Sequence, residues 1–288
     1  MMAANSAPLI EFKNVSLRYE DTWALKNVSF TLSPGETRII FGAAGSGKTT
    51  LLKAVIGLVR VDEGEIRVFG EEITSRKEEE LYILRSRAGF LFQEGGLFDS
   101  LTIGENVEYP LANRQTDGKP GKQQARSGTT GSYEQRVREA LRFVELEQTY
   151  NQFPSEVSGG MRRRVGIARA TVTEPSLVLY DSPTAGLDPI TANLIMALLA
   201  KERDVHNTAS LIVTHRYQDG ELMANYSYNS EKGELDPIRE NDGERASRTK
   251  FMVMRGGEVV FFGSHQELEA SADSYVQKFI RHEETHAI

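Results

Sequence analysis

The stretch from Phe41 to Leu52, FGAAGSGKTTLL, holds residues whose types and spacing indicate chemistry on an anion. Glycines at three of its positions let the backbone turn so that N–H groups converge on phosphate oxygens. In this pattern the lysine reaches the β- and γ-phosphates of a nucleotide and the next hydroxyl binds Mg²⁺. We therefore predict a phosphate-binding loop made of Gly42, Ala43, Ala44, Gly45, Ser46, Gly47, Lys48, Thr49 and Thr50.

The loop needs a strand before it and a helix after it. A short apolar strand, Arg38 to Phe41, precedes it, and the apolar spacing of Leu51, Leu52 and Val55 predicts a helix that runs to Leu58. The N-terminal end of that helix also favours an anion. The alternative is a glycine-rich turn that merely caps a core helix.

Two further stretches carry chemistry of the same kind. Ser158 is a good N-cap for a helix, and Gly159 and Gly160 leave backbone amides open at its start, which predicts a second phosphate site. Asp181 ends the apolar strand LVLYD, where a carboxylate can hold Mg²⁺. Taken alone, these are an ordinary capped helix and an ordinary acid at the end of a strand.

Composition limits the class of protein. The chain has 288 residues, 39% of them hydrophobic and 26% charged, which is typical of a soluble globular protein. A net charge of −7 disfavours a protein that coats nucleic acid. The chain contains neither a run of the ~18 apolar residues that span a bilayer nor a start that resembles a signal peptide. The absence of cysteine excludes disulfides, and we predict a cytoplasmic protein.

The elements that position these residues follow from periodicity. Alternating patterns over 9–19 and 24–32 predict an antiparallel β layer. Further strands are expected at 65–69, 88–92, 177–181, 209–214, 250–254 and 258–262, and helices at 76–86, 133–148, 189–203 and 273–283. This alternation predicts an α/β fold with a mostly parallel sheet and helices on both faces. The polar stretches 112–132 and 226–249 are predicted to be surface insertions, the first of them mobile.

Taken in order, GAAGSGKTT, Gln93, VSGGM, LVLYD, AGLDP and His215 resemble the motif series of ATP-binding cassette (ABC) ATPases. The resemblance covers nearly the whole chain. It implies a single ABC ATPase nucleotide-binding domain over 1–288. Within it, 1–98 and 166–288 would form the phosphate-loop core with its β layer, and 99–165 a helical subdomain that carries the VSGGM signature.

The resemblance also implies ATP and Mg²⁺ as cofactors and a role for each matching residue. Tyr19 would stack on adenine, although a core aromatic of the β layer is the alternative. Thr49, Gln93 and Asp181 would hold Mg²⁺, and Gln93 would also contact the attacking water. The ABC resemblance also implies a homodimer, in which Ser158, Gly159 and Gly160 would bind the ATP held by the other subunit. Asp188 would cross the interface between the subunits, and His215 would contact the γ-phosphate.

One position departs from the family. The residue after Asp181 is usually a glutamate that polarises the attacking water, and here it is Ser182. A serine hydroxyl is no general base near neutral pH, and general-base assistance is worth ~10²–10⁴ in rate. Because phosphoryl transfer depends mainly on positioning and charge, we expect slow hydrolysis at Gln93, Asp181, Ser182 and His215, with Glu94 as a candidate substitute. A clamp that closes on ATP and hardly hydrolyses it is the second hypothesis.

Within the family, residues 91–111, VSGGMRRR, YDSPTAGLDPIT and SADSYVQKFI are most similar to the ATPase subunit of MCE-type (maintenance of lipid asymmetry) phospholipid transporters. This implies integral-membrane permease subunits, an MCE-type lipid-binding protein as a further partner, and a place on the inner face of the bacterial cytoplasmic membrane. The permease is expected to dock at Leu97, Phe98 and 105–109. A soluble ABC protein of DNA repair or translation is disfavoured, since one cassette is present without heptads or a basic arm.

Overall fold

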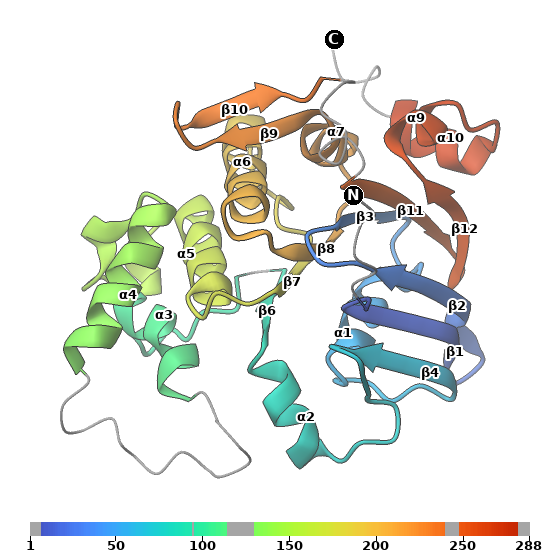
Figure 1. Ribbon diagram of the computed structural model, residues 1–288, viewed down its shortest axis with the longest axis horizontal. Coiled ribbons are helices and arrows are strands. Elements are labelled where there is room, and N and C mark those ends of the chain that lie inside the picture. Colours follow the sequence, from blue (N-terminus) through green and yellow to red (C-terminus); the bar gives the residue numbers. More distant parts are fainter. Residues whose placement is uncertain (1–6, 94, 114–129, 240–247, 282–288) are drawn as a thin grey trace.

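The computed structural model describes residues 7–93, 95–113, 130–239 and 248–281. Its centre is a six-stranded sheet in the order β12-β11-β3-β8-β7-β6 (Figure 1). The five strands from β11 to β6 are parallel, and β12 is antiparallel to β11. The bounds are β3 Thr37–Gly42, β6 Ala88–Leu91, β7 Leu177–Asp181, β8 Ala209–Val213, β11 Thr249–Arg255 and β12 Glu258–Gly263. The predicted α/β fold with a mostly parallel sheet is confirmed.

A second, antiparallel sheet has the order β2-β1-β4-β5. Its strands are β1 Ile10–Tyr19, β2 Thr22–Leu32, β4 Glu63–Val68 and β5 Glu71–Glu72. Helix α1, Lys48–Val55, lies between this layer and the central sheet, as Figure 1 shows. Its buried residues Leu51 and Leu52 share one apolar cluster with Phe12 of β1 and Leu211 of β8.

Two apolar cores flank the central sheet because successive strand residues point to opposite faces. In β3, Ile40 faces the cluster with α1 and the β layer, whereas Ile39 and Phe41 face a cluster formed with the other helices. Those helices are α3 Ile103–Ala112, α4 Thr130–Phe143, α5 Gly159–Thr171, α6 Pro189–His206, α7 Tyr217–Asn225, α9 His265–Glu269 and α10 Ser274–Arg281. Two short 3-10 turns, η1 Glu147–Thr149 and η2 Pro154–Glu156, connect α4 to α5. Helix α2, Glu78–Arg85, packs against the first cluster.

Helices α3, α4 and α5 gather at one end of the molecule, on the left of Figure 1. None of the helices in the described part of the chain is long and apolar enough to cross a membrane.

The structure corrects several predicted elements. Helix α1 ends at Val55, before the predicted Leu58, and α6 runs to His206, beyond the predicted 203. Helix α4 begins at Thr130 and ends at Phe143, earlier at both ends than the predicted 133–148, so the end of the predicted insertion 112–132 is helical; residues 114–129 lie outside the described part. The second predicted insertion contains a hairpin of β9, Tyr226–Asn229, and β10, Glu234–Pro237. Arg203 of α6 donates to the Tyr226 carbonyl at 2.8 Å, and Asp204 accepts from the Tyr228 amide at 2.7 Å. Polar strands therefore pair here because α6 anchors one of them.

Candidate functional site

The loop after β3 has the backbone that its glycines allow. Gly45 and Gly47 have φ of +75° and +101°, a region that L side chains rarely adopt. A Cβ on Gly47 would lie 2.0 Å from the carbonyl oxygen of Ala24 in β2. Gly47 is also the N-cap of α1 and offers no side-chain acceptor to the amides of the first turn. Those amides are the orphan donors that an anion at a helix start satisfies.

Lys48 folds back over this loop. Its Nζ donates to the carbonyl oxygens of Gly42 and Ala43, both at 2.7 Å, and to Ser46 Oγ at 3.2 Å. Burial lowers the pKa of Lys48, and the nearby Asp181 carboxylate partly opposes that shift. The Lys48 ammonium group therefore lies within the loop, at the position where the phosphates are predicted to bind.

Thr49 and Asp181 come together from α1 and β7. Thr49 Oγ1 donates to Asp181 Oδ1 at 3.2 Å. Burial raises the pKa of the Asp181 carboxyl, with the Thr49 hydrogen bond opposing it. A hydroxyl and a carboxylate beside a phosphate loop are the hard oxygen ligands that Mg²⁺ prefers, so these two residues fit the predicted metal.

Ser182 continues from Asp181 with a φ of +52° and is only 9% exposed. Its Oγ lies 3.5 Å from Asp181 Oδ1, and its amide donates to the Val213 carbonyl at 2.9 Å. The backbone therefore directs a hydroxyl to the side of the Thr49–Asp181 pair, where the family usually has a carboxylate. Glu94, the candidate substitute, lies outside the described residues.

Gln93 and His215 are exposed on the segments that follow β6 and β8. Arg163 of α5 ties the first of these segments to the one after β7, since it donates to the Phe92 carbonyl at 3.4 Å and the Ala185 carbonyl at 3.2 Å. The structure thus fixes the backbone beside Gln93 by a contact from the signature helix.

Asp219 of α7 ties the other segments together. It is 1% exposed, and its Oδ2 accepts from Thr184 Oγ1 at 2.5 Å and from Thr214 Oγ1 at 2.6 Å. Its carboxylate therefore joins the segment that leads to Asp188 to the segment that carries His215. Sequence reasoning missed Arg163 and Asp219 because their partners lie up to 71 residues away, and a local pattern carries no signal of that pairing.

The second predicted phosphate site lies at the start of α5. Ser158 is the N-cap and accepts from the Met161 amide at 3.2 Å, while a Cβ on Gly159 would meet open space. Asp188 caps α6 by accepting from the Thr191 amide at 3.0 Å, and hydrogen bonds with Thr191 lower its pKa. Gly160 lies against Thr191, so the two helix starts are neighbours. Helices α5 and α1 lie on opposite sides of β7 in Figure 1.

Tyr19 ends β1, and its side chain is 51% exposed. The alternative that made it a core aromatic of the β layer is therefore wrong. Its stacking on adenine stays a prediction.

The sequence model that describes the ABC transporter family matches residues 25–185 of this chain. The chain belongs to the ABC transporter family. The match spans the phosphate loop, the Ser158 helix and Asp181, whose geometry is given above. ABC transporter ATPases bind ATP with Mg²⁺ and couple its hydrolysis to transport, which confirms the predicted cofactors and enzyme class.

Among similar proteins, the methionine import ATP-binding protein MetN of Corynebacterium efficiens is 34% identical over 277 residues, which are 94% of this chain and 67% of the relative. MetN of Brucella abortus is 33% identical over 257 residues, 87% of this chain and 66% of the relative. This ABC chain thus spans about two thirds of the length of these relatives.

Solved structures agree on the fold. The dimeric ATP-binding cassette MJ0796 in a post-hydrolysis state with ADP and Pi is 29% identical, with a TM-score of 0.69, over 88% of this chain and 98% of that one. CbiO1 of Clostridium perfringens, part of the transporter complex cbiONQ, has a TM-score of 0.72 at 24% identity over 95% of each chain, and that likeness concerns the fold alone.

Proposed function

We propose that this chain is the ATP-hydrolysing subunit of a membrane ABC transporter, on the cytoplasmic face of the membrane. The observation that carries the proposal is the Lys48 loop closed beside the Thr49–Asp181 pair, which together offer a phosphate cradle and a metal site. Two copies would sandwich each ATP between the Lys48 loop of one and the Ser158 helix of the other. The division into a core, 1–98 and 166–288, and a helical subdomain, 99–165, is part of this proposal.

Two observations point to different cargoes. The MetN relatives are methionine import proteins, which supports an amino acid as the cargo. The stretches 91–111, VSGGMRRR and YDSPTAGLDPIT support a phospholipid and an MCE-type lipid-binding partner. The relatives compared above give the first of these the stronger support. Transport of radiolabelled methionine or labelled phospholipid by the reconstituted transporter separates the two cargoes.

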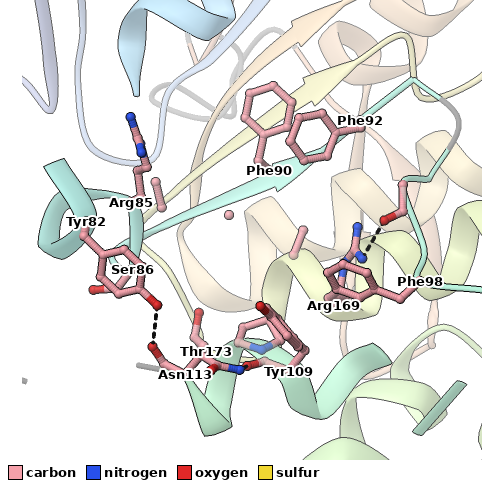
Figure 2. Close-up of a pocket in the computed structure, with 15 residues that line it drawn as sticks. Tyr82, Arg85, Ser86, Phe90, Phe92, Phe98, Tyr109, Asn113, Arg169 and Thr173 are labelled. Carbon is pink, nitrogen blue, oxygen red and sulfur yellow. Dashed lines mark hydrogen bonds between the residues drawn. The ribbon is translucent and has the colours of Figure 1, made fainter. Parts of the chain in front are cut away.

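A hollow of about 510 Å³ supports docking of a permease segment (Figure 2). It lies among α2, β6, α3 and α5, and four of its aromatic residues are at least 40% exposed: Tyr82, Phe92, Phe98 and Tyr109. Arg169 on its wall donates to the carbonyls of Gly95 and Gly96 at 2.8 Å, in the segment that follows Gln93. A segment seated here would touch the backbone next to Gln93, which gives it a route to the ATP site.

Replacement of Phe98 and Tyr109 by alanine tests this surface. Their rings are 4.8 Å apart, so together they form one apolar wall of the hollow. We expect the double variant to lose most co-purified permease while the isolated subunit keeps its ATPase rate. Phe262→Ala, which removes an equally exposed ring on β12, is the matched control. Undiminished recovery of permease by the double variant would place the docking surface elsewhere.

Ser182 favours a second candidate function, an ATP-gated clamp that turns over very slowly. The left-handed backbone at this buried residue directs a hydroxyl where a carboxylate base is usual. Loss of general-base assistance, worth ~10²–10⁴ in rate, would leave ATP bound between two closed subunits.

The deciding measurement is Mg²⁺-dependent ATP hydrolysis by the purified protein and by its permease complex. Wild type is compared with Ser182→Glu and with Lys48→Ala as the blank. A wild-type rate well above the blank supports a transport motor that tolerates Ser182. A wild-type rate equal to the blank, with turnover restored in Ser182→Glu, supports the ATP-gated clamp and rejects the hypothesis that the chain is a transport motor.

A further inference from the structure

The last helix of the described chain touches the phosphate loop. The hydroxyl of Tyr275, in α10, accepts a hydrogen bond from the Ala43 amide at 3.2 Å and donates one to the Met254 carbonyl at 3.0 Å. Met254 of β11 is the register partner of Gly42 at the end of β3. The hydroxyl therefore bridges two neighbouring strands at the point where the chain leaves the sheet and enters the loop.

Helix α10 holds this hydroxyl in a fixed place. Asp273 Oδ1 accepts from the Tyr275 amide at 2.7 Å at the start of the helix, and Val276 is fully buried. The Phe279 ring stacks 6.2 Å from that of Phe41, the residue before Gly42, and 5.2 Å from the Tyr275 ring. Figure 1 shows α10 beside α9, at the end of the molecule away from α3 and α4. The contact thus comes from a packed element rather than a loose chain end.

Ala43 is held on both sides. Its amide donates to Tyr275, and its carbonyl accepts from Lys48 Nζ at 2.7 Å. A lysine that reaches toward phosphates must leave that carbonyl. No atom of Lys48 takes part in the Tyr275 hydrogen bond, so we expect this bond to remain when Lys48 moves.

We infer that Tyr275 is a positioning residue of the ATP site, whose hydroxyl holds the first turn of the phosphate loop in the shape that binds phosphates. Helix α10 thereby contributes to ATP affinity. This inference rests on the proposed function in one respect, that the loop from Gly42 to Thr50 holds the ATP.

Tyr275→Phe removes the hydroxyl and keeps the ring. We expect it to weaken Mg-ATP binding about 3- to 10-fold, the range for one net hydrogen bond, and to raise KM for ATP more than it lowers kcat. The binding measurement is a titration of the full chain with a fluorescent ATP analogue. Tyr217→Phe, which removes a hydroxyl that bonds to His265 and Glu269 of α9 and not to the loop, is the matched variant, and its affinity should stay near that of wild type even where its Tm falls.

Four outcomes are informative. Wild-type or tighter binding by Tyr275→Phe overturns the inference. Equal losses of affinity in Tyr275→Phe and Tyr217→Phe, in proportion to their Tm, overturn it as well, because the Tyr275 hydroxyl would then act only through general stability. Lys48→Ala tests the proposed function separately: full affinity in Lys48→Ala would mean that the loop does not hold ATP, whereas lost affinity there with an unchanged Tyr275→Phe rejects only the role of Tyr275.

Discussion

At the scale of single residues, the loop glycines differ in what a side chain would cost. A Cβ on Gly47 meets the Ala24 carbonyl at 2.0 Å, whereas a Cβ on Gly45 meets no atom within 4 Å, and both have positive φ. Gly45→Ala should therefore lose only about 1–2 kcal/mol of unfolding free energy from backbone strain. Gly47→Ala adds a clash with β2 and should lose clearly more.

Thermal unfolding without nucleotide measures this difference, and Gly45→Ala is the control for strain alone. Equal losses in the two variants would contradict the close approach of the loop to β2.

The buried Asp181 carboxyl predicts a pH dependence. Because burial raises its pKa in the folded chain, the folded state binds this proton more tightly than the unfolded state does. The free energy of unfolding must then fall as pH rises from the ordinary pKa through the raised one, and stay lower above it. Asp181→Asn removes that contribution, so the nucleotide-free variant should be the more stable protein at neutral pH, with the difference shrinking in acid.

With Mg-ATP bound, we expect the opposite order of stability: wild type should then be more stable than Asp181→Asn. At 100 times its Kd, a ligand adds about 2.7 kcal/mol to wild type. Asp181→Asn should lose most of the part that depends on Mg²⁺, because an amide is a poorer ligand than a carboxylate. Unfolding curves at several pH values, with and without Mg-ATP, provide both readouts, and a variant less stable than wild type in both states would argue against this account of Asp181.

At the scale of elements, the β9–β10 hairpin depends on one buried side chain of α6. The Arg203 side chain is 2% exposed, donates to the Met223 and Tyr226 carbonyls at 2.7 and 2.8 Å, and pairs with Asp204. Arg203→Ala leaves the Asp204 carboxylate, which is 13% exposed, without its ion partner and the Tyr226 carbonyl without this donor, whereas the Met223 carbonyl still accepts from Thr249 Oγ1. The variant should lose about 3–5 kcal/mol of unfolding free energy. Arg142→Ala, which breaks an exposed pair with Glu147, is the control and should change the unfolding free energy little. Denaturant unfolding measures the free energy of unfolding of both variants. Similar small losses in Arg203→Ala and Arg142→Ala would show that Arg203 does not anchor the hairpin.

The same hairpin shows where prediction from sequence stops. Strand β7, Leu177–Asp181, was predictable to the residue because a short apolar run that ends in an acid needs no distant partner to be recognised. The strands YSYN and ELDP have no such pattern. They pair with each other, and α6 holds the first of them through Asp204, which accepts from the Tyr228 amide. At the site, the residues of the loop motif were predictable, whereas Arg163, Asp219 and Tyr275 act through partners brought near by the fold.

At the scale of the whole molecule, four segments around the predicted ATP site are tied to elements far from it. Arg163 of α5 and Asp219 of α7 connect the segments after β6, β7 and β8, and Tyr275 of α10 holds the loop after β3. The hollow beside Gln93 opens onto the first of these segments. Movement of α5 against the core would therefore reach both the residues that are predicted to hydrolyse ATP and the surface that is proposed to bind the permease, which is the coupling that a transport motor needs.

The Lys48 loop and the Ser158 helix lie on opposite sides of β7, which makes a two-copy site testable by mixing. Each proposed site takes the Lys48 loop from one copy and the Ser158 helix from the other. When a Lys48→Ala subunit pairs with a Ser158→Arg subunit, one of the two sites therefore receives both defects and the other site receives neither. Each variant alone should be inactive, and random pairing of the two should restore about a quarter of wild-type ATPase activity, since half of the pairs contain one intact site of two. A Lys48→Ala chain mixed with the Lys48→Ala, Ser158→Arg double variant is the control and should stay inactive. If the productive mixture is no more active than its separate components, each chain completes its own site, and the sandwich of two copies has to be abandoned.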